Sequence, residues 1–186
     1  MREISQELIL EAAQGDIEAF EAIYKAYSGF VYNVALRVVE RNEDAQEVTQ
    51  DVFIAIYNKL KDFAFKSSLK TWIYRITVNL AINQAKKRSR TEDRLVVYDE
   101  MHDLGAPDSA LEEKIDREHG EKVLSDLLGA LNPEQRACLV LRSIEGLSYE
   151  EISGVLEVNI NTVRTRLKRA RQKLISLKKE AVNYEM

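Results

Sequence analysis

The chain has 186 residues, with 27 basic and 31 acidic side chains and a net charge of −4. Hydrophobic residues make up 45% and charged residues 31%, which is typical of a folded globular chain and excludes a disordered one. The single cysteine, Cys138, excludes an internal disulfide and a cysteine-built zinc site. No stretch approaches the roughly 18 apolar residues of a membrane span, and acids interrupt the opening MREISQELIL. We therefore expect a cytoplasmic protein with no membrane insertion.

Apolar residues recur at helical spacing through the first half of the chain. Asp16, directly after Gly15, is placed to cap a long helix, and Asn42 is placed to cap the next one. Residues 62–68 are polar and aromatic without a clear period, so we expect a loop there. A further helix follows over 69–88. The sequence thus predicts an all-α N-terminal domain.

An acidic segment separates this domain from the rest of the chain. Between Glu92 and Glu118 there are ten acids against three basic residues, and Gly105-Ala106-Pro107 interrupts any periodicity. We expect residues 92–118 to form a linker between two small helical domains, 1–91 and 119–186.

Capping signals divide the second half into short helices. Asn132-Pro133 is typical of a helix start, Gly146 of a left-handed terminator, and Ser148 with Glu151 of a capping box. Asn161 is placed to cap the final helix. Two short helices joined by a tight turn predict a helix-turn-helix. Its wedge would be apolar and consist of Ile152, Leu156, Val158, Val163 and Leu167.

The last of these helices carries a basic outer face made of Arg164, Thr165, Lys168, Arg169 and Lys173. A helix of this kind fits the major groove of B-DNA, where arginine pairs with guanine and lysine contacts phosphates. The alternative interpretation is a solvated basic helix exterior. The capping pattern and the spacing favour DNA binding.

Aromatic and basic residues alternate before and within the helix over 69–88, at Phe63, Phe65, Lys66, Lys70, Trp72, Tyr74 and Arg75. Such residues can stack on unpaired bases and hold a short DNA bubble open. The alternative is that Trp72 and Tyr74 are ordinary core aromatics. Asn79 and Asn83 lie four residues apart on one helix face, which suits either base reading or a buried hydrogen bond.

An acidic helix side is formed by Glu43, Asp44, Glu47 and Asp51. This side would not contact DNA. It is either a solvated helix face or a docking site for a basic partner protein.

Three segments together resemble a known family, the RNA polymerase sigma factors. Residues 42–57 (NEDAQEVTQDVFIAIY) resemble the polymerase-docking helix, and residues 71–79 (TWIYRITVN) resemble the promoter-melting and −10-reading helix. Residues 147–171 (LSYEEISGVLEVNINTVRTRLKRAR) resemble the −35-reading helix-turn-helix. The two-domain layout is similar to the extracytoplasmic-function (ECF) group.

The resemblance implies a role for each surface. It implies that core polymerase is bound through the clamp of its largest subunit and through its flap, that promoter DNA is read at two elements, and that an anti-sigma protein holds the chain inactive. Clamp docking falls to Asp44, Glu47, Gln50, Asp51 and Phe53. Reading of the −10 element, with a base-capturing loop at 64–71, falls to Phe65, Lys66, Ser67, Ser68, Lys70, Trp72, Tyr74, Arg75, Asn79, Asn83, Lys86, Lys87 and Arg88. Reading of the −35 element falls to Asn161, Thr162, Arg164, Thr165, Lys168, Arg169 and Lys173.

Two other classes of protein compete with this hypothesis. A free-standing helical repressor would dimerise and bind duplex operator DNA without polymerase. An enzyme would need a glycine-rich phosphate loop, a metal motif or a nucleophile elbow, and the sequence has none. His102 and His119 are too sparse for a metal site, and Cys138 in an apolar helix is expected to be buried and inert. We therefore expect no catalytic residue, no metal and no cofactor.

Overall fold

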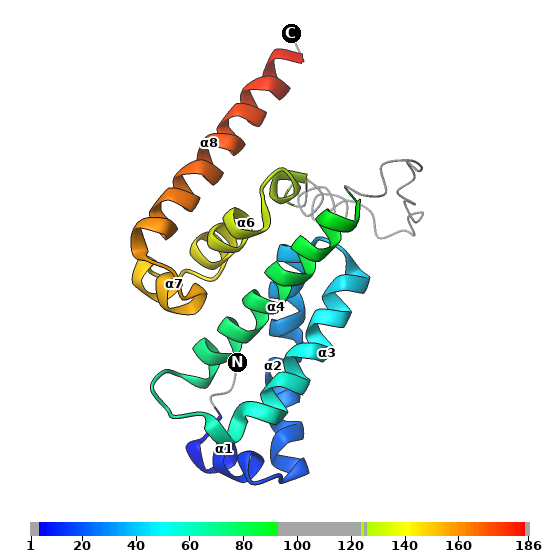
Figure 1. Ribbon diagram of the computed structural model, residues 1–186, viewed down its shortest axis with the longest axis vertical. Helices are drawn as coiled ribbons and strands as arrows, with labels where there is room; N and C mark the ends of the chain where they lie inside the picture. Colours follow the sequence, from blue (N-terminus) through cyan, green and yellow to red (C-terminus); the bar gives the residue numbers. More distant parts are fainter. Residues whose placement is uncertain (1–3, 93–123, 125, 185–186) are drawn as a thin grey trace, which may run out of the picture.

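The computed structural model describes residues 4–92, 124 and 126–184, and within these ranges every regular element is helical (Figure 1). This confirms the all-α prediction. The linker expected at 92–118 lies outside the described residues beyond Glu92. In chain order the elements are α1 (Gln6–Ala13), α2 (Ile17–Val39), α3 (Asn42–Lys59), η1 (Leu60–Asp62), α4 (Leu69–Glu92), α6 (Pro133–Leu139), the π-helical turn η2 (Val140–Ile144), α7 (Tyr149–Leu156) and α8 (Ile160–Tyr184).

The first unit is a bundle in which α2, α3 and α4 pack against one another, with α1 beside one end of α2 (Figure 1). Each long helix turns an apolar stripe inward because its apolar residues recur every three or four positions. Burying one valine or isoleucine side chain contributes about 1.5–3 kcal/mol. The largest fully buried side chains of this unit are Ile23, Val31, Val34, Val38, Val52, Ile56, Ile73 and Val78.

Side-chain caps begin two of these helices, at Ser5 for α1 and at Asp16 for α2. The carboxylate of Asp16 accepts a hydrogen bond from the Ala19 backbone amide at 2.8 Å, which confirms Asp16 as the cap of α2. The prediction that Asn42 caps α3 is wrong, because the cap residue is Arg41 and Asn42 already lies inside the helix. The amide oxygen of Asn42 instead accepts a hydrogen bond from the Tyr32 hydroxyl at 3.1 Å.

The second unit contains α6, η2, α7 and α8. Asn132 caps α6, Gly146 adopts φ +74°, and Ser148 and Glu151 form the reciprocal capping box, as predicted. The final cap differs from the prediction: α8 begins at Ile160, and the side chain of Asn159, not Asn161, accepts the hydrogen bond from the Asn161 amide at 2.8 Å. The helix-turn-helix prediction holds for the packing, because the wedge residues Ile152, Leu156, Val163 and Leu167 are buried and Val158 is half-buried.

The two units pack directly against each other. Helix α4 contacts α6 and α7, and α2 contacts α6. Buried residues of both units, such as Ile82 and Val78 of α4 and Cys138 and Leu141 of the second unit, belong to one apolar cluster. The helix-turn-helix therefore lies against α4 (Figure 1).

Candidate nucleic-acid and polymerase interfaces

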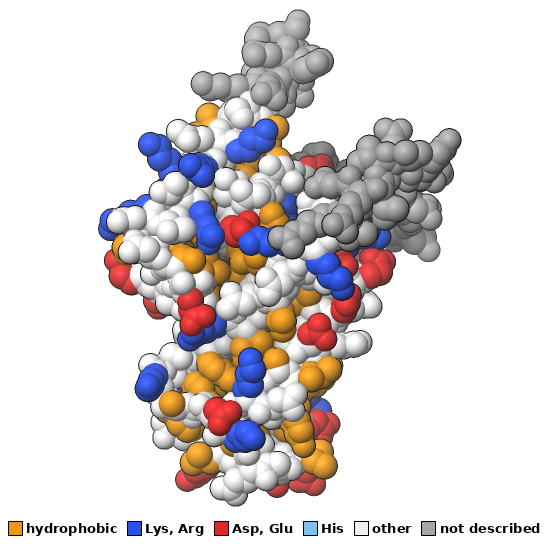
Figure 2. All heavy atoms as spheres, in the orientation of Figure 1, with side chains coloured by type: hydrophobic (Ala, Val, Ile, Leu, Met, Phe, Trp, Pro, Cys, Tyr) orange, Lys and Arg blue, Asp and Glu red, His pale blue; other side chains and the backbone are white. Residues whose placement is uncertain are grey.

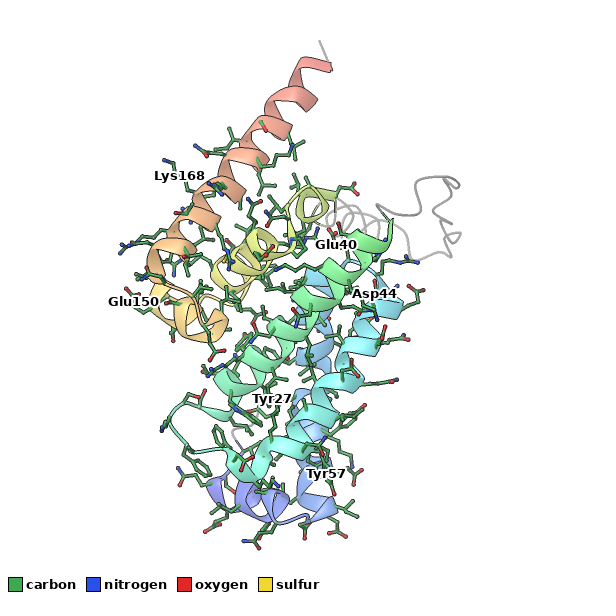
Figure 3. All side chains as sticks on the ribbon, in the orientation of Figure 1. Tyr27, Glu40, Asp44, Tyr57, Glu150 and Lys168 are labelled. Atoms are coloured by element: carbon green, nitrogen blue, oxygen red, sulfur yellow. The ribbon has the colours of Figure 1, made fainter. Side chains whose placement is uncertain are left out.

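The outer face of α8 carries the residues predicted to read DNA in the major groove. Its inner positions Val163, Leu167 and Ala170 are at most 1% exposed, which fixes the rotation of the helix. Basic side chains gather on the side of the molecule formed by α8, and Lys168 points away from the protein (Figures 2 and 3). Thr162 is half-buried, and the other predicted residues are all exposed: Asn161, Arg164, Thr165, Lys168, Arg169 and Lys173.

Local hydrogen bonds orient the first turn of this face. The Arg164 guanidinium donates to the Asn161 side-chain oxygen at 3.0 Å, and the Thr165 hydroxyl donates to the Asn161 carbonyl at 2.8 Å. The turn before α8 lacks the glycine often found there. Glu157 takes the left-handed conformation in its place, with φ +51°.

The loop between η1 and α4 presents its predicted residues to solvent. Lys66, Ser67 and Ser68 are exposed, and Phe65 is 39% exposed with φ +53°. A positive φ is strained for an aromatic residue and persists only where the surroundings hold it. The Phe63 ring provides part of that support, since its centroid lies 4.8 Å from that of Phe65.

A hollow of about 480 Å³ lies between this loop and α1. We call it the loop hollow. The predicted residues Phe65, Ser67, Ser68 and Lys70 form part of its wall, whereas Trp72 lies outside it, half-buried with its ring centroid 5.2 Å from that of Phe63. Its complete lining is Ile4, Gln6, Ile9, Tyr27, Phe63, Phe65, Ser67, Ser68, Leu69 and Lys70.

One side of α4 faces the second unit, and three predicted −10 residues are engaged there. Tyr74 is 2% exposed and donates its hydroxyl hydrogen bond to Glu145. Burial and that carboxylate raise the pKa of Tyr74, so the hydroxyl stays protonated. The predicted stacking of Tyr74 on bases is not available in this arrangement.

The two basic residues on the same side form ion pairs with the second unit. Arg75 pairs with Glu157, and the Lys86 ammonium lies 2.5 Å from a Glu134 carboxylate oxygen. Although partial burial opposes it, the Lys86 contact lowers the pKa of Glu134. Asn79 is half-buried and shares this side of α4, because it lies four residues after Arg75 and seven before Lys86.

The remaining predicted residues of α4 lie elsewhere. Asn83 and Lys87 are exposed. Arg88 is half-buried and forms an ion pair with Asp44 of α3 at 3.4 Å. Arg88 is thus engaged within the first unit in this structure.

The predicted docking helix α3 has an exposed polar side made of Glu47, Gln50 and Asp51. Asp44 is half-buried, and Gln84 of α4 donates to both Asp44 and Glu47, at 3.2 and 2.8 Å.

The structure corrects the position of Phe53, which is 6% exposed and packs its ring 4.6 Å from that of Tyr24. The helical period turns Phe53 inward beside Val52 and Ile56, and Ile54, 59% exposed, takes the outward position. A single exposed isoleucine is common on protein surfaces, and the helical period is the signal that could have distinguished Ile54 from Phe53.

Arg136 is a second residue that sequence analysis missed. It is 6% exposed and joins α6 to the end of α2, where its guanidinium lies 2.6 Å from both the Val38 carbonyl and the Glu40 carboxylate. Figure 3 shows Glu40 at the place where α2 approaches the second unit. Nothing in the local sequence signals the contact with α2, because Val38 lies 98 positions away in the chain.

Cys138 is buried, as predicted, and burial raises the pKa of its thiol to about 11. Within the described ranges, no three His, Cys, Asp or Glu side chains gather closely enough to hold a metal ion. His102 and His119 lie outside the described residues. None of the described helices combines the length and the apolar character that crossing a membrane requires.

Comparison with known proteins matches both units. Residues 23–91 match the family model "Sigma-70 region 2", and residues 121–174 match "Sigma-70, region 4". The ECF RNA polymerase sigma-E factor of Haemophilus influenzae is 34% identical over 174 residues, which cover 90% of this chain and 91% of the relative. The RNA polymerase sigma-H factor of Pseudomonas aeruginosa is 33% identical over 177 residues, covering 92% of each chain.

Solved structures share the fold. CnrH, in complex with the cytosolic domain of CnrY, has a TM-score of 0.65 at 24% identity and covers 93% of this chain and 96% of its own. The sigma factor RpoE, in complex with the anti-sigma factor NepR from Bartonella quintana, has a TM-score of 0.62 at 24% identity, covering 88% and 98%. An all-helical chain that matches both sigma-70 regions is a transcription initiation factor. The chain belongs to the sigma-70 family, within its ECF group.

Proposed function

We propose that the chain binds core RNA polymerase and directs it to promoters through three separate surfaces. The exposed side of α3, with Glu47, Gln50, Asp51 and Ile54, contacts the clamp. The loop hollow and α4 receive the opened −10 DNA, and the outer face of α8 reads the −35 element. The chain has no catalytic chemistry of its own, needs no cofactor, and acts in the cytoplasm.

The observation that carries this proposal is the division of α8 into two faces. Val163 and Leu167 anchor one face in the second unit, so Arg164, Lys168 and Arg169 project together from the other. A helix in the major groove needs this separation, because only outward side chains reach base edges. A direct arginine–guanine contact is worth about 1–3 kcal/mol of discrimination.

Promoter binding at Arg75 and Lys86 would displace two ion pairs of α4. Arg75 and Lys86 pair with carboxylates of the second unit, and DNA phosphates carry the same charge as those carboxylates. Engagement of the −10 DNA along this side of α4 therefore requires α6 and α7 to move away from it. Domain boundaries at 1–91 and 119–186, joined by the acidic linker, would permit that movement.

Run-off transcription with core polymerase and a library of upstream sequences tests the proposal. We expect transcripts that start downstream of a paired −35 and −10 motif, and we expect Arg164→Ala to weaken selection at −35 alone. Arg171→Ala is the matched control, since Arg171 is exposed on α8 outside the proposed reading set. Tight operator binding by the lone chain, with no effect on polymerase, would favour a repressor instead.

We further propose an anti-sigma protein as the regulatory partner. Support comes from membership of the family and from RpoE of Bartonella quintana, which was solved with the anti-sigma factor NepR. Co-purification from native cells tests this. A free and fully active protein during unstressed growth would contradict it.

A further inference from the structure

The loop hollow has a second wall that the proposed −10 residues do not include. Three of its lining residues, Ile4, Gln6 and Ile9, belong to α1 or precede it directly. Ile9 is 5% exposed, so this wall is anchored in the core of the first unit. The hollow is therefore shaped by α1 as much as by the loop.

The lining has the chemistry of a nucleobase site. Apolar and aromatic side chains, among them Tyr27, Phe63 and Phe65, provide surfaces that a flat ring can contact. A volume of about 480 Å³ lies within the range of roughly 300–1,000 Å³ that small-ligand pockets occupy. The strained backbone of Phe65, with φ +53°, holds its ring at the edge of this space.

Few polar groups of the hollow remain available to read a base. The Ser68 hydroxyl accepts a hydrogen bond from the Thr71 amide at 3.1 Å and shares another with the Thr71 hydroxyl at 2.8 Å. The Lys70 ammonium can only donate, and it lies 5.4 Å from the Phe30 ring centroid. Ser67 makes a long hydrogen bond to the Ser68 carbonyl, at 3.4 Å.

Gln6 differs from these groups. It is exposed in the first turn of α1, and its side chain makes no hydrogen bond to any residue within the described ranges. A primary amide offers donors and an acceptor side by side, which matches the edge of a base. The Ser5 cap and the buried Ile9 fix the helix turn from which it projects.

We propose that Gln6 reads the hydrogen-bonding edge of an unstacked base held in the loop hollow, so that α1 helps to set specificity at one −10 position. This inference rests on the proposed promoter-binding function. It adds a specificity-determining residue from outside the loop and α4.

The test is run-off transcription with the full chain and core polymerase on a library randomised across the −10 element. A carboxylate only accepts hydrogen bonds, so Gln6→Glu should shift the preference at one position towards the bases that carry an amino donor (guanine, adenine and cytosine) and away from thymine. We expect a change of about tenfold in relative use of the bases at that position. Gln6→Leu, which neither donates nor accepts, should flatten the preference there.

Gln14→Glu is the matched control, because it adds the same charge at the exposed C-terminal end of α1, about 12 Å along the helix. It should leave the base preference unchanged. If both Gln6 variants transcribe with the wild-type preference, or lose transcription uniformly over all sequences while Gln14→Glu does not, the inference is wrong. If the wild-type chain itself selects no promoter, the proposed function is wrong. That result differs from failure of the Gln6 inference, in which the wild-type chain still selects promoters.

Discussion

Replacing Arg136 with methionine is expected to lower the free energy of unfolding by about 3–5 kcal/mol, because it removes one partner of a buried ion pair. Arg136 is 6% exposed, and all its polar contacts are made inside the protein. Its guanidinium donates to the carbonyls of Val38 at 2.6 Å, Leu128 at 2.8 Å, Leu131 at 2.9 Å and Gly129 at 3.4 Å, and pairs with Glu40 at 2.6 Å. Methionine keeps the apolar stem but leaves these acceptors without a donor.

The expected loss is large enough to measure by calorimetry or urea unfolding. For a chain of this length, each kcal/mol shifts Tm by about 2–4 °C, so the Arg136→Met variant should melt roughly 6–20 °C below the wild type. Arg171→Met is the matched control, since Arg171 is exposed, and it should change stability by less than about 0.5 kcal/mol.

A second variant distinguishes the contribution of the Arg136 guanidinium to stability from that of the charge on its partner, Glu40. Burial raises the pKa of Glu40 more than Arg136 lowers it, so ionised Glu40 is itself costly in the folded protein. Glu40→Gln keeps an acceptor for Arg136 and should therefore cost far less than Arg136→Met. An Arg136→Met variant as stable as the control, or a Glu40→Gln variant that loses more stability, would refute the account of this contact.

Three further outcomes follow from the surfaces. Asp51→Lys should reduce core-polymerase binding in a pull-down without altering −35 selection, whereas Arg164→Ala should do the reverse. Glu157→Gln should strengthen binding of a single-stranded −10 oligonucleotide by no more than about fivefold in a fluorescence titration, because exposed ion pairs are worth roughly 0–1 kcal/mol. Because the folded pKa of Glu134 is below 4.5, its contribution to stability is present above pH 4.5 and is lost as pH falls through the folded pKa. Wild type and Glu134→Gln should therefore differ in Tm at neutral pH and converge in acid.

Each of these predictions would be contradicted by a specific result. If Asp51→Lys and Arg164→Ala had equal defects in polymerase binding and in −35 selection, α3 and α8 would not have separate roles. Glu150→Gln, an exposed change on α7, is the control for Glu157→Gln, and equal binding by both would show that the Arg75 pair does not compete with DNA. If the Tm difference between wild type and Glu134→Gln persisted unchanged in acid, the ion pair with Lys86 would not be its cause.

Helices and most of their ends could be predicted because the signals are local. The side chains of Asp16, Asn132 and Ser148 each accept a hydrogen bond from an amide three residues away. Such caps can be predicted because both partners lie within a short stretch of sequence. The outer face of α8 was predictable for the same reason, since the 3.6-residue period assigns Arg164 and Val163 to different sides.

Where two residues near a boundary could cap equally well, the choice needed the structure. Asn42 accepts a hydrogen bond from Tyr32 of α2 instead of capping α3. At the start of α8, the side chain of Asn159 accepts the hydrogen bond from the Asn161 amide, so Asn159 takes the place predicted for Asn161. The burial of Tyr74 likewise depends on neighbouring helices. An aromatic residue in a periodic stretch is compatible with either a core or a surface position.

Local periodicity and capping were thus enough to determine the helices, the basic outer face of α8 and the acidic side of α3. Only the tertiary structure decided that the second unit lies on α4, with Tyr74 bonded to Glu145 and Arg136 to Val38, 71 and 98 positions apart. It also decided that Gln6 of α1 shares a hollow with Ser67. Such contacts join residues with no common local pattern, and they form only when packed apolar faces bring distant helices together.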